Sequence, residues 1–380
     1  MWRLQYLDRI DDVPAALWNE VAGDDYPFTR HEFLATLERT GAVSSSTGWT
    51  PQHLLVWHGR ELVAVLPLYL KDHSWGEYVF DWSWADAAAQ LGIDWHPKLL
   101  AAIPYTPATG PRLCIRAGEP ADQVTAAVVE ELRRRVRDDG LSSLHLLFPT
   151  AEACDELAAA GLAVRHGAQY HWFNQQYRDF DDFLATVSSR KRKNLRKERQ
   201  RVVEQGIELR VLEGDAVTAA EWRRFHHFYQ FTYARRSGHG GYLPAAFFSE
   251  IGRLLPEKVV LVLADWQGET IAGALNFRDS ETLYGRYWGC IQEFDQLHFE
   301  ACYYQGIDYC IRHGLLRFDP GAQGEHKIQR GFRPITTYSC HWIEHGRLRR
   351  AIDHFLAQER RHIAHYLQDA ATLLPFRAPD

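Results

Sequence analysis

The 380-residue sequence lacks the features of several specialised protein classes. No apolar run approaches the roughly 20 residues that a membrane-spanning helix needs, and residues 1–12 show no basic stretch followed by an apolar core. The formal net charge is −6, which argues against a protein that coats DNA. We therefore expect a soluble, cytoplasmic protein with neither a membrane span nor a DNA partner.

The cysteines are few and scattered, and no Cys-x-x-Cys pair occurs. This spacing predicts reduced thiols rather than a disulfide framework or a structural zinc site. Cys340, His341 and His345 lie on one expected strand and its turn, with no pair of acids in register, so we expect no metal site. The six cysteines are Cys114, Cys154, Cys290, Cys302, Cys310 and Cys340.

The sequence does contain alternating helix and strand patterns, and the same order of elements occurs in each half. Each half reads strand, two helices, hairpin, strand, helix, strand, which predicts an N-terminal domain at 1–177 and a C-terminal domain at 178–380. In the second half, strands are expected at 258–264, 271–278 and 282–289, then a helix at 298–313 and a buried strand at 316–318. This is the element order at the centre of a GNAT fold. Other expectations are a single helix over 180–205, an irregular segment at 99–115 and a strand-like run at 82–84.

Four stretches resemble one protein family. They are IPYTPATGPR at 103–112, SSRKRKNLRK at 188–197, GHGGY at 238–242 and FDPGAQGEHKIQRGFR at 318–333. The sequence is similar to the FemAB-like family of predicted N-acyltransferases, of the peptidoglycan biosynthesis/recognition type, over nearly its whole length. The resemblance implies a bacterial α/β protein with tandem GNAT-like domains and mixed central sheets. It also implies that the second domain holds the transfer site.

Residues 190–201 carry eight basic side chains. One interpretation is a solvated helix, and the other is an anion-binding surface for a phosphate-bearing carrier or for tRNA. Related Fem transferases use aminoacyl-tRNA as donor, which favours the second interpretation, whereas the overall negative charge disfavours it. The candidate anion-binding residues are Arg190, Lys193, Arg196 and Lys197.

The connection 291–297 is where a GNAT enzyme would grip the pyrophosphate of acyl-CoA with glycine-rich backbone. Here it contains no glycine and two carboxylates, which argues against ordinary acetyl-CoA chemistry. Acyl-CoA and aminoacyl-tRNA both remain candidate donors, and no tightly bound cofactor is expected.

Glu300 begins the expected helix 298–313 and shares a face with Tyr304 and Asp308 at four-residue spacing. One interpretation is that its charge stabilises the start of the helix, and the other is a general base that deprotonates an attacking amine.

The loop after the expected strand 316–318 is glycine-rich and ionisable, and α/β folds place ligands at such strand ends. We predict that Lys327 and Arg330 stabilise negative charge and that His326 moves a proton, with Lys327 exposed to solvent. The alternative is a surface turn. The substrate-binding candidates here are Gln323, Glu325 and Arg330, beside an aromatic wall formed by Tyr284, Tyr287 and Trp288 with Arg286.

The proline-stiffened loop 104–111 is either a substrate-recognition loop or a connector, and it supplies the candidates Thr109 and Arg112. Taken together, the sequence predicts transfer of an acyl or aminoacyl group from a thioester or ester to an amine on a small molecule or peptide. Two alternatives stay open: a degenerate GNAT pair that binds an acyl-peptide or cell-wall fragment without catalysis, and an aminoacyl-tRNA-dependent ligase. The oligomeric state is open as well.

Overall fold

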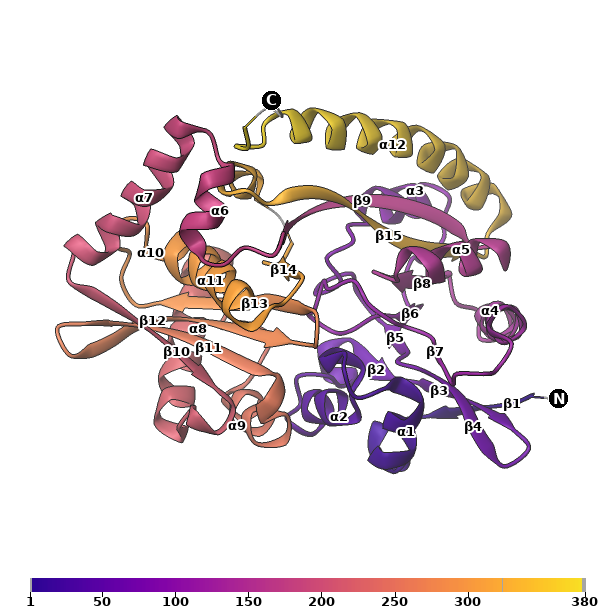
Figure 1. Ribbon diagram of the computed structural model, residues 1–380. Helices are drawn as coiled ribbons and strands as arrows, with labels where there is room; N and C mark the ends of the chain where they lie inside the picture. Colours follow the sequence, from indigo (N-terminus) through magenta and orange to yellow (C-terminus); the bar gives the residue numbers. More distant parts are fainter. Residues whose placement is uncertain (1, 323, 378–380) are drawn as a thin grey trace. The chain divides into compact units, whose positions relative to one another are not determined.

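The computed structural model describes residues 2–322 and 324–377 (Figure 1). Packing divides the chain into two units: unit 1 is Met1–Ala168 with Thr336–Tyr366, and unit 2 is Gln169–Ile335 with Leu367–Asp380. The sequence pattern places the division between 177 and 178, whereas the packing places it nine residues earlier. The packing also assigns the later segment Thr336–Tyr366 to unit 1, because Ser339 to Ile343 pair with Leu147 to Ser143.

Unit 1 contains two small sheets with helices packed on them. One sheet has the antiparallel order β1-β3-β4-β7. In the other, β2, β5 and β6 pair antiparallel, β6 and β8 pair parallel, and the end of β15 pairs with β8. The elements are β1 (Trp2–Leu7), α1 (Ala15–Ala22), α2 (His31–Arg39), β2 (Trp49–Pro51), β3 (His53–His58), β4 (Glu61–Leu66), β5 (Tyr69–Lys71), α3 (Trp82–Gln90), β6 (Lys98–Ala101), β7 (Cys114–Ile115), α4 (Ala121–Asp138), β8 (Ser143–Leu147) and α5 (Ala151–Ala159).

One local expectation in unit 1 holds in part and another fails. The segment 99–115, expected to be irregular, is irregular between 102 and 113, but its ends lie in β6 and β7. The run at 82–84, expected to be strand-like, is the first turn of α3, which continues through an alanine-rich stretch to Gln90. Alanine is the strongest helix former, and only Trp84 and Ala88 of this helix are buried. Local helix propensity therefore outweighs the preference of tryptophan for strands.

Unit 2 is built on a mixed sheet, which Figure 1 shows with α8 beside it. Strands β10, β11, β12 and β13 are antiparallel neighbours, β14 pairs parallel with β13, and the end of β9 pairs antiparallel with β14. The elements are α6 (Phe180–Thr186), α7 (Ser189–Glu204), β10 (Ile207–Glu213), α8 (Ala219–Ser237), α9 (Ala245–Leu254), β11 (Val259–Trp266), β12 (Glu269–Arg278), β13 (Thr282–Cys290), α10 (Leu297–Phe299), α11 (Gln305–His313) and β14 (Arg317–Asp319). Three further elements are divided between the units: β9 (Ala163–Phe173), β15 (Arg333–Ile343) and α12 (Gly346–Thr372), of which the last two lie mostly in unit 1.

Two helices of unit 2 differ from the sequence pattern. The expected helix 180–205 is broken into α6 and α7 because Val187 is extended, with φ −88° and ψ 144°. The expected helix 298–313 contains a π-helical turn, Glu300–Tyr304, between α10 and α11. Such turns insert one residue into a helix and often occur at functional sites.

All six cysteines are free, as the sequence predicts, and five of them are buried. Within residues 2–322 and 324–377, no helix combines the length and apolar character needed to cross a membrane.

Candidate functional site

Asp319 is the centre of a buried polar cluster at the end of β14. Its carboxylate is fully buried and pairs with Arg286 of β13, at 2.5 Å from Nη2 and 3.3 Å from Nη1. The backbone N–H of Gly321 donates to it at 2.9 Å, and His171 Nε2 lies 3.6 Å away. Burial alone would raise the pKa of Asp319, but Arg286 and His171 lower it to about 2. The carboxylate is therefore charged throughout the physiological range.

A β-bulge directs Arg286 into this cluster. Tyr287 pairs with Leu275 and Gly285 with Asn276, so Arg286 is an extra residue on β13 without its own partner on β12. A bulge bends the strand and re-aims the side chain that it carries. The guanidinium, 2% exposed, can therefore meet Asp319 on the neighbouring strand.

Lys327 lies in the 3₁₀ helix Glu325–Arg330 that follows, and it is buried at 2% exposure. The expectation that it is solvent-exposed was wrong, because its side chain points inward, to the backbone of Gly321 and the ring of Tyr303. Its ammonium donates to the carbonyl of Gly321 at 2.7 Å and lies 5.9 Å from the ring centre of Tyr303. Burial lowers the pKa of Lys327 to about 8, although Asp319 opposes the shift.

His326 is exposed as a residue, and its ring is held on one side by Tyr303. The tyrosine hydroxyl and Nε2 lie 2.9 Å apart. Partial burial, together with the cations Arg330 and Lys327, lowers the pKa of His326, so the imidazole is neutral at neutral pH. Gly324 makes room for it: this residue has φ +108°, and a Cβ there would lie 2.5 Å from Cε1 of the ring.

The remaining candidates of the loop differ from one another. Arg330 is buried, donates to Glu198 of α7 and to the carbonyl of His326, and stacks 3.5 Å from the ring centre of Phe299. These contacts fix the 3₁₀ helix against α7. Glu325 is exposed, and Gln323 lies outside the described residues.

The three aromatic candidates of β13 have different neighbours. The hydroxyl of Tyr284 donates to Asp279 at 2.6 Å. Tyr287 meets the ring of Tyr229 on α8, whereas Trp288 meets His298 next to Phe299 on α10. These contacts do not join the three rings into one surface.

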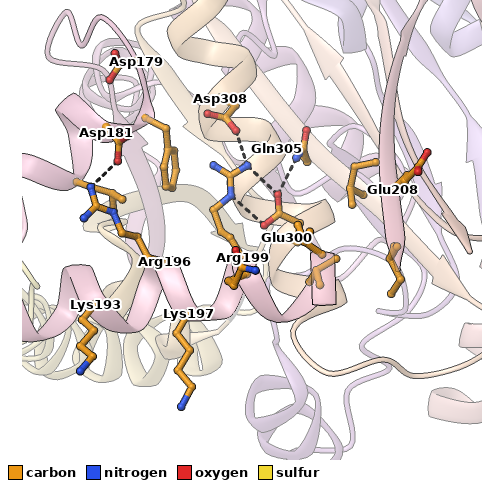
Figure 2. A pocket seen from close by; sticks show the side chains of 17 residues that line it. Asp179, Asp181, Lys193, Arg196, Lys197, Arg199, Glu208, Glu300, Gln305 and Asp308 are labelled. Atoms are coloured by element: carbon orange, nitrogen blue, oxygen red, sulfur yellow. Dashed lines mark hydrogen bonds and ion pairs between the residues drawn. The ribbon is translucent and has the colours of Figure 1, made fainter. Parts of the chain in front are cut away.

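A groove of about 1370 Å³ lies beside α7 in the same unit (Figure 2). Both oxygens of Glu300 accept hydrogen bonds inside it, from Arg199 at 2.9 and 3.1 Å and from Gln305 at 2.7 Å. Arg199 also pairs with Asp308 at 2.7 Å, so Glu300 and Asp308 share a face as expected. The lining residues are Asp179, Phe180, Asp181, Leu184, Lys193, Arg196, Lys197, Arg199, Gln200, Val202, Val203, Ile207, Glu208, Leu209, Glu300, Gln305 and Asp308.

The basic candidates of α7 fall into two groups. Arg196 pairs with Asp181 at 2.7 Å. Lys193 and Lys197 are exposed, and Figure 2 shows them projecting from the side of α7 opposite to Arg199. Arg190 is exposed at the start of the helix. The structure thus brings Glu300 and three of the four basic candidates to one groove.

The two candidates of unit 1 sit in a rigid loop. Arg112 is 1% exposed and donates to backbone carbonyls, including those of Leu147 at 2.7 Å and Ala108 at 2.6 Å. Its guanidinium holds the loop 104–111 in place. The hydroxyl of Thr109 is buried and has no partner within the described part of the chain.

Sequence reasoning passed over Asp319, Tyr303, His171 and Arg199. Asp319 lies inside one of the motifs, and a carboxylate directly after a buried strand and before Pro-Gly is a usable signal. Arg199 was counted in the basic run, but its acidic partners lie about 100 residues away, so only the fold reveals the pairing.

Residues 9–378 match the FemAB-like family, described as peptidoglycan biosynthesis/recognition. The chain belongs to this family. No curated protein sequence matches this FemAB-like chain.

Solved structures resemble the FemAB-like chain at low identity. The C-terminal domain of a putative lysylphosphatidylglycerol synthetase from Agrobacterium fabrum is 9% identical with a TM-score of 0.53, covering 91% of this chain and 94% of that one. L-PGS from Bacillus licheniformis is 11% identical with a TM-score of 0.50, covering 83% and 91%. A tandem GNAT protein from the clavulanic acid pathway is 11% identical with a TM-score of 0.48, covering 90% and 99%. The predicted fold class, tandem GNAT-like α/β with mixed central sheets, is confirmed.

Proposed function

We propose that this FemAB-like protein transfers an acyl or aminoacyl group from a thioester or ester donor to an amine on a small-molecule or peptide acceptor. The observation that carries the proposal is Lys327, a buried ammonium with a single hydrogen bond among the described residues, to Gly321. The transition state of acyl transfer places negative charge on the carbonyl oxygen, and a fixed cation in a dry setting stabilises that charge strongly. Burying an ammonium is unfavourable unless it gains such a partner.

In this proposal the amine attacks the donor carbonyl and His326 takes the amine proton. A neutral imidazole has a free lone pair for this task, and the lowered pKa of His326 keeps it neutral at pH 7. Lys327 stabilises the oxyanion, while Asp319 and Arg286 hold the turn at Gly321 that positions it. The tetrahedral intermediate then collapses: the bond from the carbonyl carbon to the donor sulfur or oxygen breaks, and the proton held by His326 passes to the leaving thiolate or alkoxide.

Glu300 receives a positioning role. Both of its oxygens already accept hydrogen bonds from Arg199 and Gln305, so neither is free to meet an incoming amine. The ion pair between Glu300 and Arg199 holds α7 against the π-helical turn and so shapes the groove.

Two observations support a proposal for the donor. The connection 291–297 after β13 has no glycine whose backbone N–H groups could approach a pyrophosphate closely. The arginines beside it are already engaged, since Arg235 pairs with Glu293 at 3.3 Å and Arg201 with Asp295 at 2.8 Å. Instead, α7 carries Lys193 and Lys197 as exposed cations that project from the side of the helix opposite to Arg199. We therefore place aminoacyl-tRNA ahead of acyl-CoA as donor, and we propose no tightly bound cofactor.

The Lys327→Met variant tests the reaction. Acyl-CoA thioesters and aminoacyl-tRNAs are offered to the full-length protein with a panel of peptide and small-molecule amines, and amide formation is followed by mass spectrometry. We expect the variant to lose about a hundredfold in kcat/KM, because one oxyanion-stabilising group contributes roughly that factor. Arg223→Met, at an exposed position of α8, is the control and should keep full activity. Full activity of Lys327→Met would contradict the proposal, and amine binding without any transfer would support the degenerate, non-catalytic alternative.

The Lys197→Glu variant tests the donor. If tRNA is bound along α7, this charge reversal should weaken tRNA binding several-fold and reduce its salt dependence by about one counterion. Arg223→Glu makes the same charge change at an exposed position of α8 and should have no effect. Equal effects of both variants would show that only the overall charge matters.

A further inference from the structure

Residues 72–82 of unit 1, between β5 and α3, display large aromatic side chains to solvent. Trp75 is 58% exposed, Phe80 53% and Trp82 41%. Apart from Phe355, no other large hydrophobic side chain is so exposed in the described part of unit 1. The rings of Trp75 and Trp82 lie side by side, with centroids 5.2 Å apart and planes at 58°. Exposed apolar groups gathered in this way mark an interaction site.

The same segment is tied down from the inside by polar side chains. Ser74, Glu77 and Asp81 are buried, and all three contact the ammonium of Lys98 on β6, at 3.0, 2.9 and 2.5 Å. Asp81 also accepts from Trp95 Nε1 at 2.8 Å. Inward polar residues therefore alternate with outward aromatic ones along the segment.

This anchoring holds the segment that carries the exposed aromatic side chains in a rigid conformation. Between Trp75 and Glu77 the chain turns at Gly76, with φ +83°, where a Cβ would lie 2.7 Å from the ring of Tyr105. The carbonyl of Phe80 accepts from Arg165 at 2.6 Å. A pre-organised aromatic surface loses little conformational freedom when a ligand binds, so the entropic cost of binding is low.

Two exposed acidic residues flank the segment and bear on the kind of ligand. Asp86 is exposed and lies one helical turn after Trp82, and Asp72 is exposed three residues before Trp75. Carboxylates repel an anionic membrane surface, but they accept hydrogen bonds from hydroxyl groups. The exposed apolar side chains of the segment are aromatic rather than aliphatic, which suits a flat ring with an apolar face and a polar edge.

We propose that Trp75 and Trp82 form a stacking platform for a neutral sugar ring, so that unit 1 binds an oligosaccharide. The apolar C–H face of the sugar packs on the indoles while its hydroxyls meet Asp86. This inference does not depend on the transfer reaction proposed for unit 2.

The experiment uses the full-length protein and a soluble β-1,4-linked oligosaccharide of N-acetylglucosamine as probe, with binding measured by calorimetry. Trp75→Ala and Trp82→Ala should each weaken binding by about tenfold or more, since an aromatic contact contributes roughly that factor. Phe231→Ala removes a comparably exposed ring in α8 of unit 2 and should leave the affinity within twofold. Unchanged circular dichroism of each variant confirms that it is folded.

Three results would overturn the proposal. One is no heat of binding for the unaltered protein at millimolar probe, and another is equal binding by all three variants. The third is that Trp75→Ala abolishes sedimentation with vesicles of anionic phospholipid, or abolishes self-association in ultracentrifugation, while sugar binding is unaffected.

Discussion

Each unit buries a lysine beside carboxylates, and the two lysines differ in how completely their ammonium groups are satisfied. Lys98 of unit 1 is fully buried and reaches three side-chain oxygens, those of Ser74, Glu77 and Asp81. An ammonium has three protons, so this cation is saturated. Lys327 of unit 2 is 2% exposed and makes one hydrogen bond among the described residues, to the carbonyl of Gly321.

Under the proposed function, the difference separates a structural cation from a catalytic one. In unit 1 Lys98 compensates the charges of the buried carboxylates Glu77 and Asp81. In unit 2 Arg286 compensates the carboxylate of Asp319, and Lys327 has no second hydrogen bond within residues 2–322 and 324–377, so the proposal assigns its remaining protons to the substrate oxygen. Burial depth alone would have ranked the two lysines as equivalent.

Stability should show the largest contrast. Lys98→Met leaves Glu77 and Asp81 buried without their cation, so we expect a loss of about 3–5 kcal/mol in the free energy of unfolding. Lys327→Met keeps the Arg286–Asp319 pair and nearly the same volume, so we expect a loss below about 1.5 kcal/mol. Urea denaturation followed by tryptophan fluorescence measures both, with Lys197→Met as an exposed reference. Equal losses for Lys98→Met and Lys327→Met would remove the distinction between the two lysines.

The pH dependence of turnover provides a second contrast, with a fall of about tenfold per pH unit once Lys327 is deprotonated. Because the folded pKa of Lys327 is lowered from 10.5 to about 8, turnover should fall as the pH rises through 8 and the ammonium loses its proton. Stability should move the other way. Between pH 8 and 10.5 the unfolded state binds more protons at this site, so the unaltered protein gains stability relative to Lys327→Met. Rate profiles and denaturation from pH 6 to 10 check both signs, and a profile of Lys327→Met with the same alkaline limb would assign that limb elsewhere.

Gly324→Ala should have the smallest effect, a decrease of about three- to tenfold in turnover. The added Cβ would displace the ring of His326 from Tyr303, and φ +108° strains any residue with a side chain. Lys327 itself should stay in place, so the alkaline limb near pH 8 should persist. Gly268→Ala, at φ +83° with open space around the Cβ, is the matched control for backbone strain alone. If both variants lose activity equally, the position of the His326 ring does not matter.

Much of the fold could be predicted from sequence periodicity, and most of the site could not. The strands 258–264, 271–278 and 282–289 were predicted because alternating or continuous apolar runs between turn residues leave few other choices. The break at Val187 and the π-helical turn at Glu300 carry no such signal, since both depend on packing against distant segments. The family motif drew attention to Lys327, but its burial follows from the turn at Gly321 and from a bulge at Arg286 that only strand pairing reveals.

The route of the chain also bears on how the protein folds as it is synthesised. Unit 1 includes the first residues of the sequence, yet β15, which pairs with one edge of β8, starts almost 190 residues after β8 ends. At roughly 5–20 residues per second, a ribosome needs about 10–40 s to deliver it. During this time all the strands of the unit 2 sheet emerge from the ribosome. The edge of β8 that later pairs with Ser339 to Ile343 has no partner strand until then. The first-made unit is thus completed only after every strand of the unit 2 sheet has been made, and its exposed strand edge is where a chaperone would be needed most.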